Sequence, residues 1–244
     1  MYPYYSQQRV VVWLYERNKN AHRSSWVNIW NWNSKYCSLS GHLAGSSGIF
    51  IDRARQTGLA LADGAHLETS VPLTTITEAQ YFTKIRGKSA TLFSVSAELG
   101  AYIGGGSFCD IEALAEFGER FGLAYQIKDD LDDLKANNGL IPPDLINRIP
   151  TLPVIHLYQN GGQRVRGLLE KSFSKEVSLD DAHQIMVELE RNGSILYCEQ
   201  KIVENVDAAC NALSVIKSSK DKNLFLGMFK MIIPLEKRLK NYAY

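Results

Sequence analysis

The sequence has little cysteine and no excess of charge of either sign. Its 244 residues include four widely spaced cysteines, at positions 37, 109, 198 and 210, and no two of them form a C-x-x-C pair or a zinc-ligand pattern. With 27 basic and 26 acidic residues the net charge is +1, which argues against a general nucleic-acid-binding or anionic-membrane surface. The scarcity of cysteine argues against a disulfide-rich secreted protein, so we expect free thiols in a reducing, cytoplasmic compartment.

Long hydrophobic runs and strict apolar–polar alternation are also lacking. Near the start, a short apolar patch at Val10–Leu14 is flanked by Arg9 and Glu16, which makes it too short and too charged for a signal peptide or a membrane span. The near absence of alternating residues argues against a β-sheet. We therefore expect a protein without a membrane span and without extended strands.

The composition and the spacing of apolar residues predict one helical domain over positions 1–244. Hydrophobic residues make up 45% of the chain and charged residues 22%, values typical of a globular protein with a sizeable core. Apolar residues recur at spacings of three and four, as in Leu114, Phe117, Phe121 and Tyr125, and this spacing predicts an all-α protein with long helices from about residue 76 to 216. Gly104–Gly106 predicts a helix C-cap followed by a turn.

The first 36 residues are unusually aromatic and contain all four tryptophans, at positions 13, 26, 30 and 32. Aromatic side chains in such a segment either pack onto a helical core or form the wall of a binding cleft or a partner interface. The sequence leaves both interpretations open.

An acidic cluster at residues 129–133 is the most informative segment. On a helix, at about 100° per residue, Gln126, Asp129, Asp130 and Asp133 share one face, whereas Asp132 lies on another side. Aspartates at this spacing repel one another and are poor helix-interior residues. If the helix is half-buried, as its aromatic neighbours suggest, these carboxylates need cations or neutralisation.

Clustered carboxylate oxygens suit a hard cation, and Mg²⁺ in proteins takes one or two carboxylates together with water and substrate phosphates. The cluster therefore indicates either a Mg²⁺ bridge to a diphosphate or a solvated acidic helix turn. Gly118 and Gly122 fall on the same face, where they would leave a slot above a metal or let another helix pack closely. Lys128 and Asp132 are spaced for an i,i+4 ion pair.

A diphosphate site also needs cations, and residues 84–88 supply Lys84, Arg86 and Lys88. Gly87-Lys88-Ser89 is superficially similar to a phosphate-binding loop. That motif requires a glycine where this chain has Phe82, and it also requires a preceding strand. We therefore reject the P-loop interpretation.

Taken together, these segments resemble the trans-prenyltransferase family, the polyprenyl diphosphate synthases, over residues 61–216. Lys88-Ser89-Ala90 with Leu92-Phe93 resembles the family's K-T-A-x-L-F. The segment from Phe117 to Asp133 resembles F-G-x-x-x-G-x-A-F-Q-I-x-D-D-x-x-D, the second aspartate-rich motif. Pro150-Thr151-Leu152-Pro153 resembles the P-T-L-P that follows it.

The resemblance implies an all-α isoprenoid-synthase fold around a central apolar cavity, with the N-terminal helices missing or divergent. It implies Mg²⁺-dependent condensation of an allylic prenyl diphosphate with isopentenyl diphosphate by a homodimer, or by a heterodimer with a related synthase. Carried over to this sequence, the metal ligands are Asp129, Asp130 and Asp133. The catalytic residues are Lys88 and Gln126, and the substrate-binding residues are Lys88, Ser89, Gln126 and Arg23.

The sequence departs from the family pattern upstream of Lys88, where the first motif, D-D-x-x-D followed by paired arginines, is expected. No such acidic cluster exists there. One alignment places Val11–Tyr15 at the motif and His22-Arg23 at the arginine pair, over a divergent segment 1–60. Otherwise the chain starts after that motif. A further departure is Ile149, which stands where the family has a lysine.

Three hypotheses follow. The chain is a prenyltransferase that works with one acidic motif, or a non-catalytic, regulatory subunit that pairs with a complete synthase. As a third possibility, a class I terpene cyclase shares the ionisation chemistry, although Lys88-Ser89-Ala90 and the P-T-L-P segment favour chain elongation.

Overall fold

The computed structural model describes residues 47–135 and 140–232 and contains only helices and turns in these two ranges. Arg23, the aromatic segment and the alignment at Val11–Tyr15 lie outside the described residues. The long helices predicted between residues 76 and 216 are confirmed. No helix in the described part of the chain combines the length and apolar character that crossing a membrane requires.

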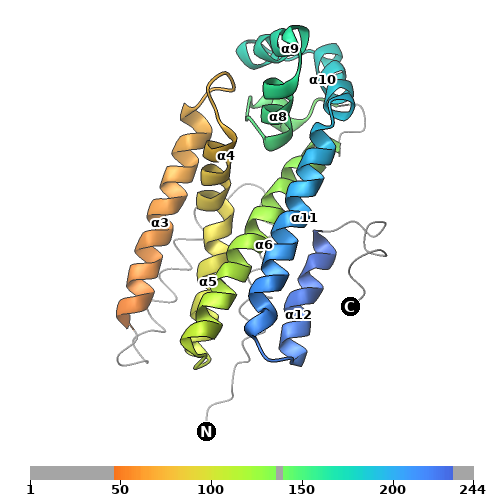
Figure 1. Ribbon diagram of the computed structural model, residues 1–244. Helices are drawn as coiled ribbons and strands as arrows, with labels where there is room; N and C mark the ends of the chain where they lie inside the picture. The colour runs from red at the N-terminus through yellow and green to blue at the C-terminus, as the bar shows by residue number, and fades with distance from the viewer. Residues whose placement is uncertain (1–46, 136–139, 233–244) are drawn as a thin grey trace.

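The helices carry the labels of Figure 1. The described residues begin with α3 (Ser47–Ser70), followed by α4 (Glu78–Ile85), the π-helical turn η1 (Arg86–Ala90) and α5 (Thr91–Ile103). Next come α6 (Phe108–Lys135), α7 (Pro143–Ile146), α8 (Leu152–Asn160), α9 (Gln163–Ser174) and α10 (Leu179–Arg191). The last are α11 (Ser194–Ala212), the 3-10 turn η2 (Leu213–Val215), α12 (Lys220–Met228) and the 3-10 turn η3 (Phe229–Met231).

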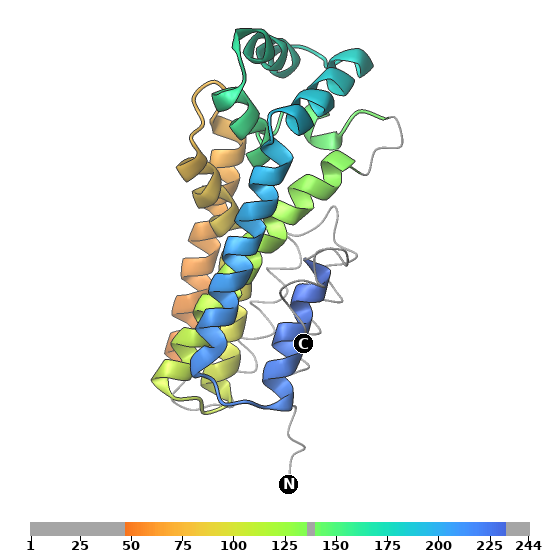
Figure 2. The ribbon, with the colours of Figure 1, turned by 45° about the vertical axis from the view of Figure 1, so that its right-hand side comes forward.

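Helix α6 is the centre of the bundle, with α5 packed on one side and α11 on the other (Figure 1). Helix α3 packs against η1 and α5, and the short helices α8, α9 and α10 gather at one end. Figure 2 shows α11 running along α6, with α12 beside them. The carboxyl end of α6, which carries the acidic cluster, therefore lies toward the end of the bundle covered by α8.

The turn between α5 and α6 follows the glycines identified in the sequence. Helix α5 ends at Ile103 with Gly104 as its C-cap, and Gly105 adopts a φ of 71°, which glycine reaches without steric cost. Ser107 and Asp110 then bond reciprocally: the Asp110 N–H donates to Ser107 Oγ at 3.2 Å, and the Ser107 N–H donates to Asp110 Oδ2 at 2.9 Å. This capping arrangement satisfies two N–H groups and starts α6.

Two glycines decide how closely α6 approaches the chain before it. A Cβ added to Gly118 would lie 2.5 Å from the carbonyl oxygen of Phe93, and one added to Gly122 would lie 2.5 Å from the Cα of Ala90. Both glycines therefore serve close helix packing, which decides between the two uses that the sequence left open. The close approach brings Phe93 against Phe121, with ring centroids 5.1 Å apart, inside the main apolar core.

Candidate diphosphate and metal site

The acidic end of α6 presents its aspartates as helix geometry predicts. Asp130 is buried, with 7% of its surface exposed, while Asp129 and Asp133 are half-buried and Asp132 is exposed. The predicted ion pair between Lys128 and Asp132 is present. Three carboxylates thus face the interior or its margin, and the fourth is neutralised at the surface.

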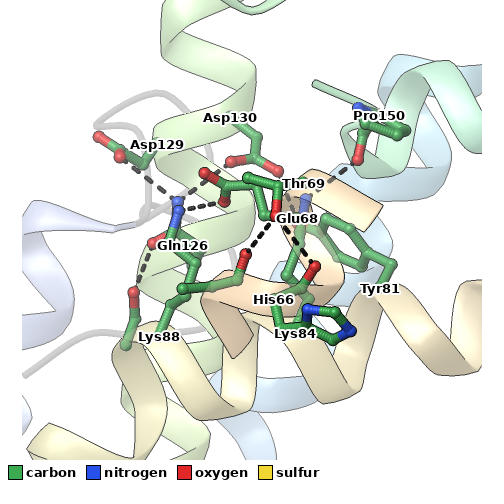
Figure 3. A network of polar contacts seen from close by, with 12 residues as sticks. His66, Glu68, Thr69, Tyr81, Lys84, Lys88, Gln126, Asp129, Asp130 and Pro150 are labelled. Atoms are coloured by element: carbon green, nitrogen blue, oxygen red, sulfur yellow. Dashed lines mark hydrogen bonds and ion pairs between the residues drawn. The ribbon is translucent and has the colours of Figure 1, made fainter. Parts of the chain in front are cut away.

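A chain of hydrogen bonds joins this end of α6 to the segment that carries Lys88 (Figure 3). The hydroxyl of Ser89 donates to Gln126 Oε1 at 2.6 Å. The Gln126 amide then donates to Asp130 Oδ1 at 3.1 Å and, more weakly, to Asp129 Oδ2 at 3.5 Å. Gln126 therefore orients two of the carboxylates while Ser89 orients Gln126.

The π-helical turn η1 places Lys88 and Ser89. The N–H of Thr91 bonds to the carbonyl of Arg86, five residues earlier, instead of the usual four. Such turns are rare insertions in helices and occur frequently at functional sites. The wider turn sets Ser89 against Gln126 and leaves Lys88 in an ion pair with Glu68 of α3.

Asp130 is held from a second direction by α4. The hydroxyl of Tyr81 donates to Asp130 Oδ2 at 2.7 Å, so each oxygen of this carboxylate accepts a hydrogen bond. Burial raises the pKa of Asp130, and the opposing effects are the positive charge of Lys84 and the bonds from Tyr81 and Gln126. Asp130 is thus a buried acid whose partners are built into the fold.

Lys84 supplies a buried positive charge in the same network. Only 3% of its surface is exposed, and its ammonium donates to the carbonyl oxygen of Pro150 at 3.1 Å while lying 5.0 Å from the centre of the Tyr81 ring. Burial lowers the pKa of Lys84, and attraction to Asp130 and Glu68 opposes this shift.

A further carboxyl group, that of Asp144 in α7, is influenced by the charges of the cluster. Burial, followed by the charges of Asp130 and Asp133, raises the pKa of Asp144 to about 7. Because these charges act over short distances, Asp144 lies in the same electrostatic environment as the end of α6. Asp144 therefore adds to the site a carboxyl group that keeps its proton up to about neutral pH.

The donor set is compatible with Mg²⁺ as a partly hydrated ion. In the described part of the chain, no three carboxylate, histidine or cysteine side chains are gathered closely enough to form a metal cage. Mg²⁺ usually keeps several waters and uses one or two carboxylates with substrate phosphates. Asp129 and Asp133, one helical turn apart on the half-buried face, provide oxygen donors of that kind.

Sequence analysis missed three contributors to this site: Glu68, Tyr81 and Asp144. A signal existed for Tyr81, since it precedes Lys88 by seven residues and so falls on one helical face with it. Lys84, which the sequence offered only as one of three nearby cations, is buried inside the network. The fold brings together four of the site residues predicted from the sequence: Ser89, Gln126, Asp129 and Asp130. Two others, Lys88 and Asp133, lie at the margin of the site. The remaining one, Arg23, is outside the described residues.

A family model for polyprenyl synthetases matches residues 47–188, a range that contains Lys88-Ser89-Ala90, the aspartate-rich segment of α6 and Pro150–Pro153. The chain belongs to the polyprenyl synthetase family. Within this family, an octaprenyl diphosphate synthase from Haemophilus influenzae is 28% identical over 158 residues, covering 62% of this chain and 47% of that protein. The chain spans about half the length of the curated relatives it matches.

Solved structures of polyprenyl synthases confirm the all-α isoprenoid-synthase fold. One from Roseobacter denitrificans matches with a TM-score of 0.70 and 24% identity over 75% of this chain and 61% of that one. Another, from Caulobacter crescentus and solved with calcium and isoprenyl diphosphate, matches with a TM-score of 0.66 and 21% identity over 72% of this chain and 56% of that one.

Proposed function

We propose that this polyprenyl synthetase family member binds prenyl diphosphates through Mg²⁺ and condenses an allylic prenyl diphosphate with isopentenyl diphosphate. The observation that carries the proposal is the connected chain from Ser89 through Gln126 to Asp129 and Asp130. It joins the two segments that carry the family resemblance, which lie 37 residues apart in sequence. We also propose that residues 1–244 form a single domain, as the sequence predicts.

In this proposal Asp129 and Asp133 hold Mg²⁺, which would neutralise the negative charge that develops on the leaving diphosphate. Lys88 contacts the diphosphate after exchanging its partner Glu68 for the ligand, and Gln126 contacts the ligand or the reacting centre. The role of Asp130 as a metal ligand stays a prediction, because both of its oxygens already accept hydrogen bonds from Tyr81 and Gln126. The Tyr81 hydroxyl and the Gln126 amide thereby fix the orientation of the Asp130 carboxylate.

Positioned cations are the chemical requirement of this reaction. Diphosphate departs only when charges placed in advance stabilise its developing negative charge. Lys88 and the buried Lys84 provide two such charges beside the acidic face. The Caulobacter crescentus structure with calcium and isoprenyl diphosphate supports the same pairing of a divalent cation with a diphosphate.

A second candidate function is that of a non-catalytic subunit that pairs with a complete synthase. The observation that favours it is the lack of any paired aspartates upstream of Lys88 in the 244 residues. The ion pair that engages Lys88 with Glu68 favours it as well. Under this alternative the site binds a prenyl diphosphate without ionising it, and the protein alters the product length of its partner.

Product analysis separates the two functions. The purified protein is incubated with farnesyl diphosphate, radiolabelled isopentenyl diphosphate and Mg²⁺, alone and with a complete polyprenyl synthase, and Asp129→Ala serves as the control. We expect a longer prenyl diphosphate from the protein alone and none from the variant. No product alone, together with a changed chain length in the mixture, would replace the catalytic proposal with the regulatory one.

A further inference from the structure

Helices α4, α8 and α11 meet in a polar cluster at the end of the bundle where α8 lies (Figure 1). The imidazole of His156 in α8 stacks on the ring of Tyr197 in α11, with ring centroids 4.3 Å apart and planes inclined by 22°. The Tyr197 hydroxyl reaches α4, where it lies 2.8 and 2.7 Å from the two carboxylate oxygens of Glu78. All three side chains are half-buried. They are distinct from the residues assigned above to the diphosphate and the metal.

Helix α4 is held by three hydrogen bonds at residues spaced by three, each to a different part of the fold. The bonds join Glu78 to Tyr197 in α11, Tyr81 to Asp130 in α6, and Lys84 to Pro150 before α8. Residues at this spacing lie on neighbouring turns of a helix. Because α4 has only eight residues and runs directly into η1, a bond at its first turn helps to set where its last turn and Lys88 lie.

The surroundings fix which groups of the cluster carry protons. Burial, followed by the hydrogen bond to Glu78, raises the pKa of Tyr197, so the phenol stays protonated and donates. Burial lowers the pKa of His156, against the attraction of Glu78, so the imidazole is neutral at neutral pH. Its Nδ1 lies 2.9 Å from the Oγ of the fully buried Ser194. Ser194 is the first residue of α11, and the positive end of a helix dipole disfavours an imidazolium there.

Protonation of His156 would change the partner of Glu78. Glu78 is the carboxylate that attracts a charge on His156, so an imidazolium competes with the Tyr197 hydroxyl for it. From α11, the ammonium of Lys201 lies 5.4 Å from the centre of the Tyr197 ring. From α9, Arg166 donates to two carbonyls in the last turn of α8, and α6 approaches α8 with its acidic end. Other charges of α9 and α10 pair with each other, as in Lys171–Asp181 and Arg164–Glu188.

We propose that Tyr197 is a positioning residue of the diphosphate site: its hydroxyl holds α4 through Glu78, and the neutral ring of His156 holds Tyr197. The inference rests on the proposed function, since α4 and η1 carry Lys84 and Lys88 into that site. It makes diphosphate binding weaker when Tyr197 loses its hydroxyl or His156 gains a proton, although neither residue touches the ligand.

Isothermal titration of inorganic pyrophosphate in the presence of Mg²⁺ tests the contact between Tyr197 and Glu78. Tyr197→Phe keeps the stacked ring but removes the donor, Glu78→Ala removes the acceptor, and Glu78→Gln keeps an acceptor oxygen. The matched control is Tyr158→Phe, which removes a bond of the same kind that ties α8 to Glu170 in α9.

We expect Tyr197→Phe and Glu78→Ala to bind pyrophosphate roughly threefold to thirtyfold more weakly than wild type. Because both act through one contact, we expect no further loss in the double variant and a recovery of binding in Glu78→Gln. Wild-type binding by Tyr197→Phe, or an equal loss in Tyr158→Phe, would overturn the inference.

The pH profile of binding tests His156. Wild type and His156→Phe, which keeps an aromatic ring against Tyr197 but cannot be protonated, are titrated between about pH 5.5 and pH 7.5, a range that brackets the usual pKa of histidine. Phosphate groups also titrate in this range, so the ratio of the two affinities is compared at each pH. We expect the wild type to lose affinity relative to His156→Phe as the pH falls. A constant ratio would overturn the role of His156.

Hydrogen exchange without ligand separates a failure of this inference from a failure of the proposed function. We expect the backbone amides of residues 78–90 to exchange faster in Tyr197→Phe than in wild type or Tyr158→Phe. Unchanged exchange in this segment would overturn the inference, because Tyr197 would then not hold α4. If the wild type does not bind pyrophosphate with Mg²⁺, the proposed function fails and the positioning role fails with it, whereas the exchange rates still report whether Tyr197 anchors α4.

Discussion

The hydroxyl of Tyr81 and the carboxylate of Asp130, 49 residues apart in sequence, meet in a buried 2.7 Å hydrogen bond between α4 and α6. Tyr81 is fully buried, and its pKa is raised well above the usual value, first by burial and then by the charge of Asp130. The phenol therefore stays protonated and donates. This contact fixes one side of the aspartate-rich face before any ligand arrives.

Replacing Tyr81 with phenylalanine tests this contact. The ring still fills the core, but one oxygen of a buried carboxylate loses its donor, so we expect the free energy of unfolding to fall by about 1–3 kcal/mol. Urea denaturation measures the change. Tyr158→Phe is the matched control, because Tyr158 makes an equally short hydrogen bond to Glu170 in an exposed position. An equal decrease in the free energy of unfolding of both variants would show that the buried hydrogen bond to Asp130 stabilises the fold no more than an exposed one.

Lys84→Met tests the buried cation. Methionine retains most of the apolar length of the side chain, but Pro150 loses its donor and Asp130 loses a nearby positive charge. We expect a loss of about 1.5–3 kcal/mol in the free energy of unfolding. Lys128→Met, which breaks only the surface pair with Asp132, is expected to cost no more than about 0.5 kcal/mol. An unchanged free energy of unfolding in Lys84→Met would show that the fold does not need the charge of Lys84.

Asp144 makes stability depend on pH. Because its pKa is raised from 3.8 to about 7 in the folded state, folded Asp144 keeps a proton that the unfolded chain releases. The free energy of unfolding therefore decreases as pH rises from about 4 through about 7. We expect Asp144→Asn to flatten this dependence and, at pH 8, to be more stable than wild type by on the order of 1–3 kcal/mol.

Thermal unfolding at several pH values, without divalent cations, measures this dependence. Asp63→Asn, at an exposed position of α3, is the control and should follow the wild-type profile. The opposite result would be a wild type that becomes more stable over this pH range while Asp144→Asn does not. It would show that Asp144 is ionised in the folded protein and stabilised there by a partner.

Asp129→Ala tests the metal assignment. Asp129 and Asp133 are the half-buried carboxylates of the site face, and removing one leaves a single donor for Mg²⁺. We expect Mg²⁺-dependent binding of pyrophosphate to be lost in isothermal titration. Asp132→Ala is the matched control, because Asp132 lies on the same helix, is exposed and pairs with Lys128. Wild-type titration heats from Asp129→Ala would exclude Asp129 as a ligand.

The sequence alone determined the helical class and the arrangement of the acidic face. Apolar spacing fixes the period of a helix, and this period places Gln126, Asp129, Asp130 and Asp133 together whatever surrounds them. The pair between Lys128 and Asp132 and the turn at Gly104–Gly106 were predictable for the same reason, since each depends on neighbours within a few residues. The family motifs were readable in the same segments.

Only the tertiary structure decided which carboxylate is buried and which cations meet it. The hydrogen bond of Tyr81 to Asp130 joins residues 49 positions apart, and that of Lys84 to Pro150 joins residues 66 positions apart. Such contacts depend on how helices pack against one another, and local periodicity carries no information on that packing. The π-helical turn at Arg86–Ala90 and the left-handed backbone of Arg148 were likewise not predicted from the sequence, because neither conformation is the one that its own residues prefer.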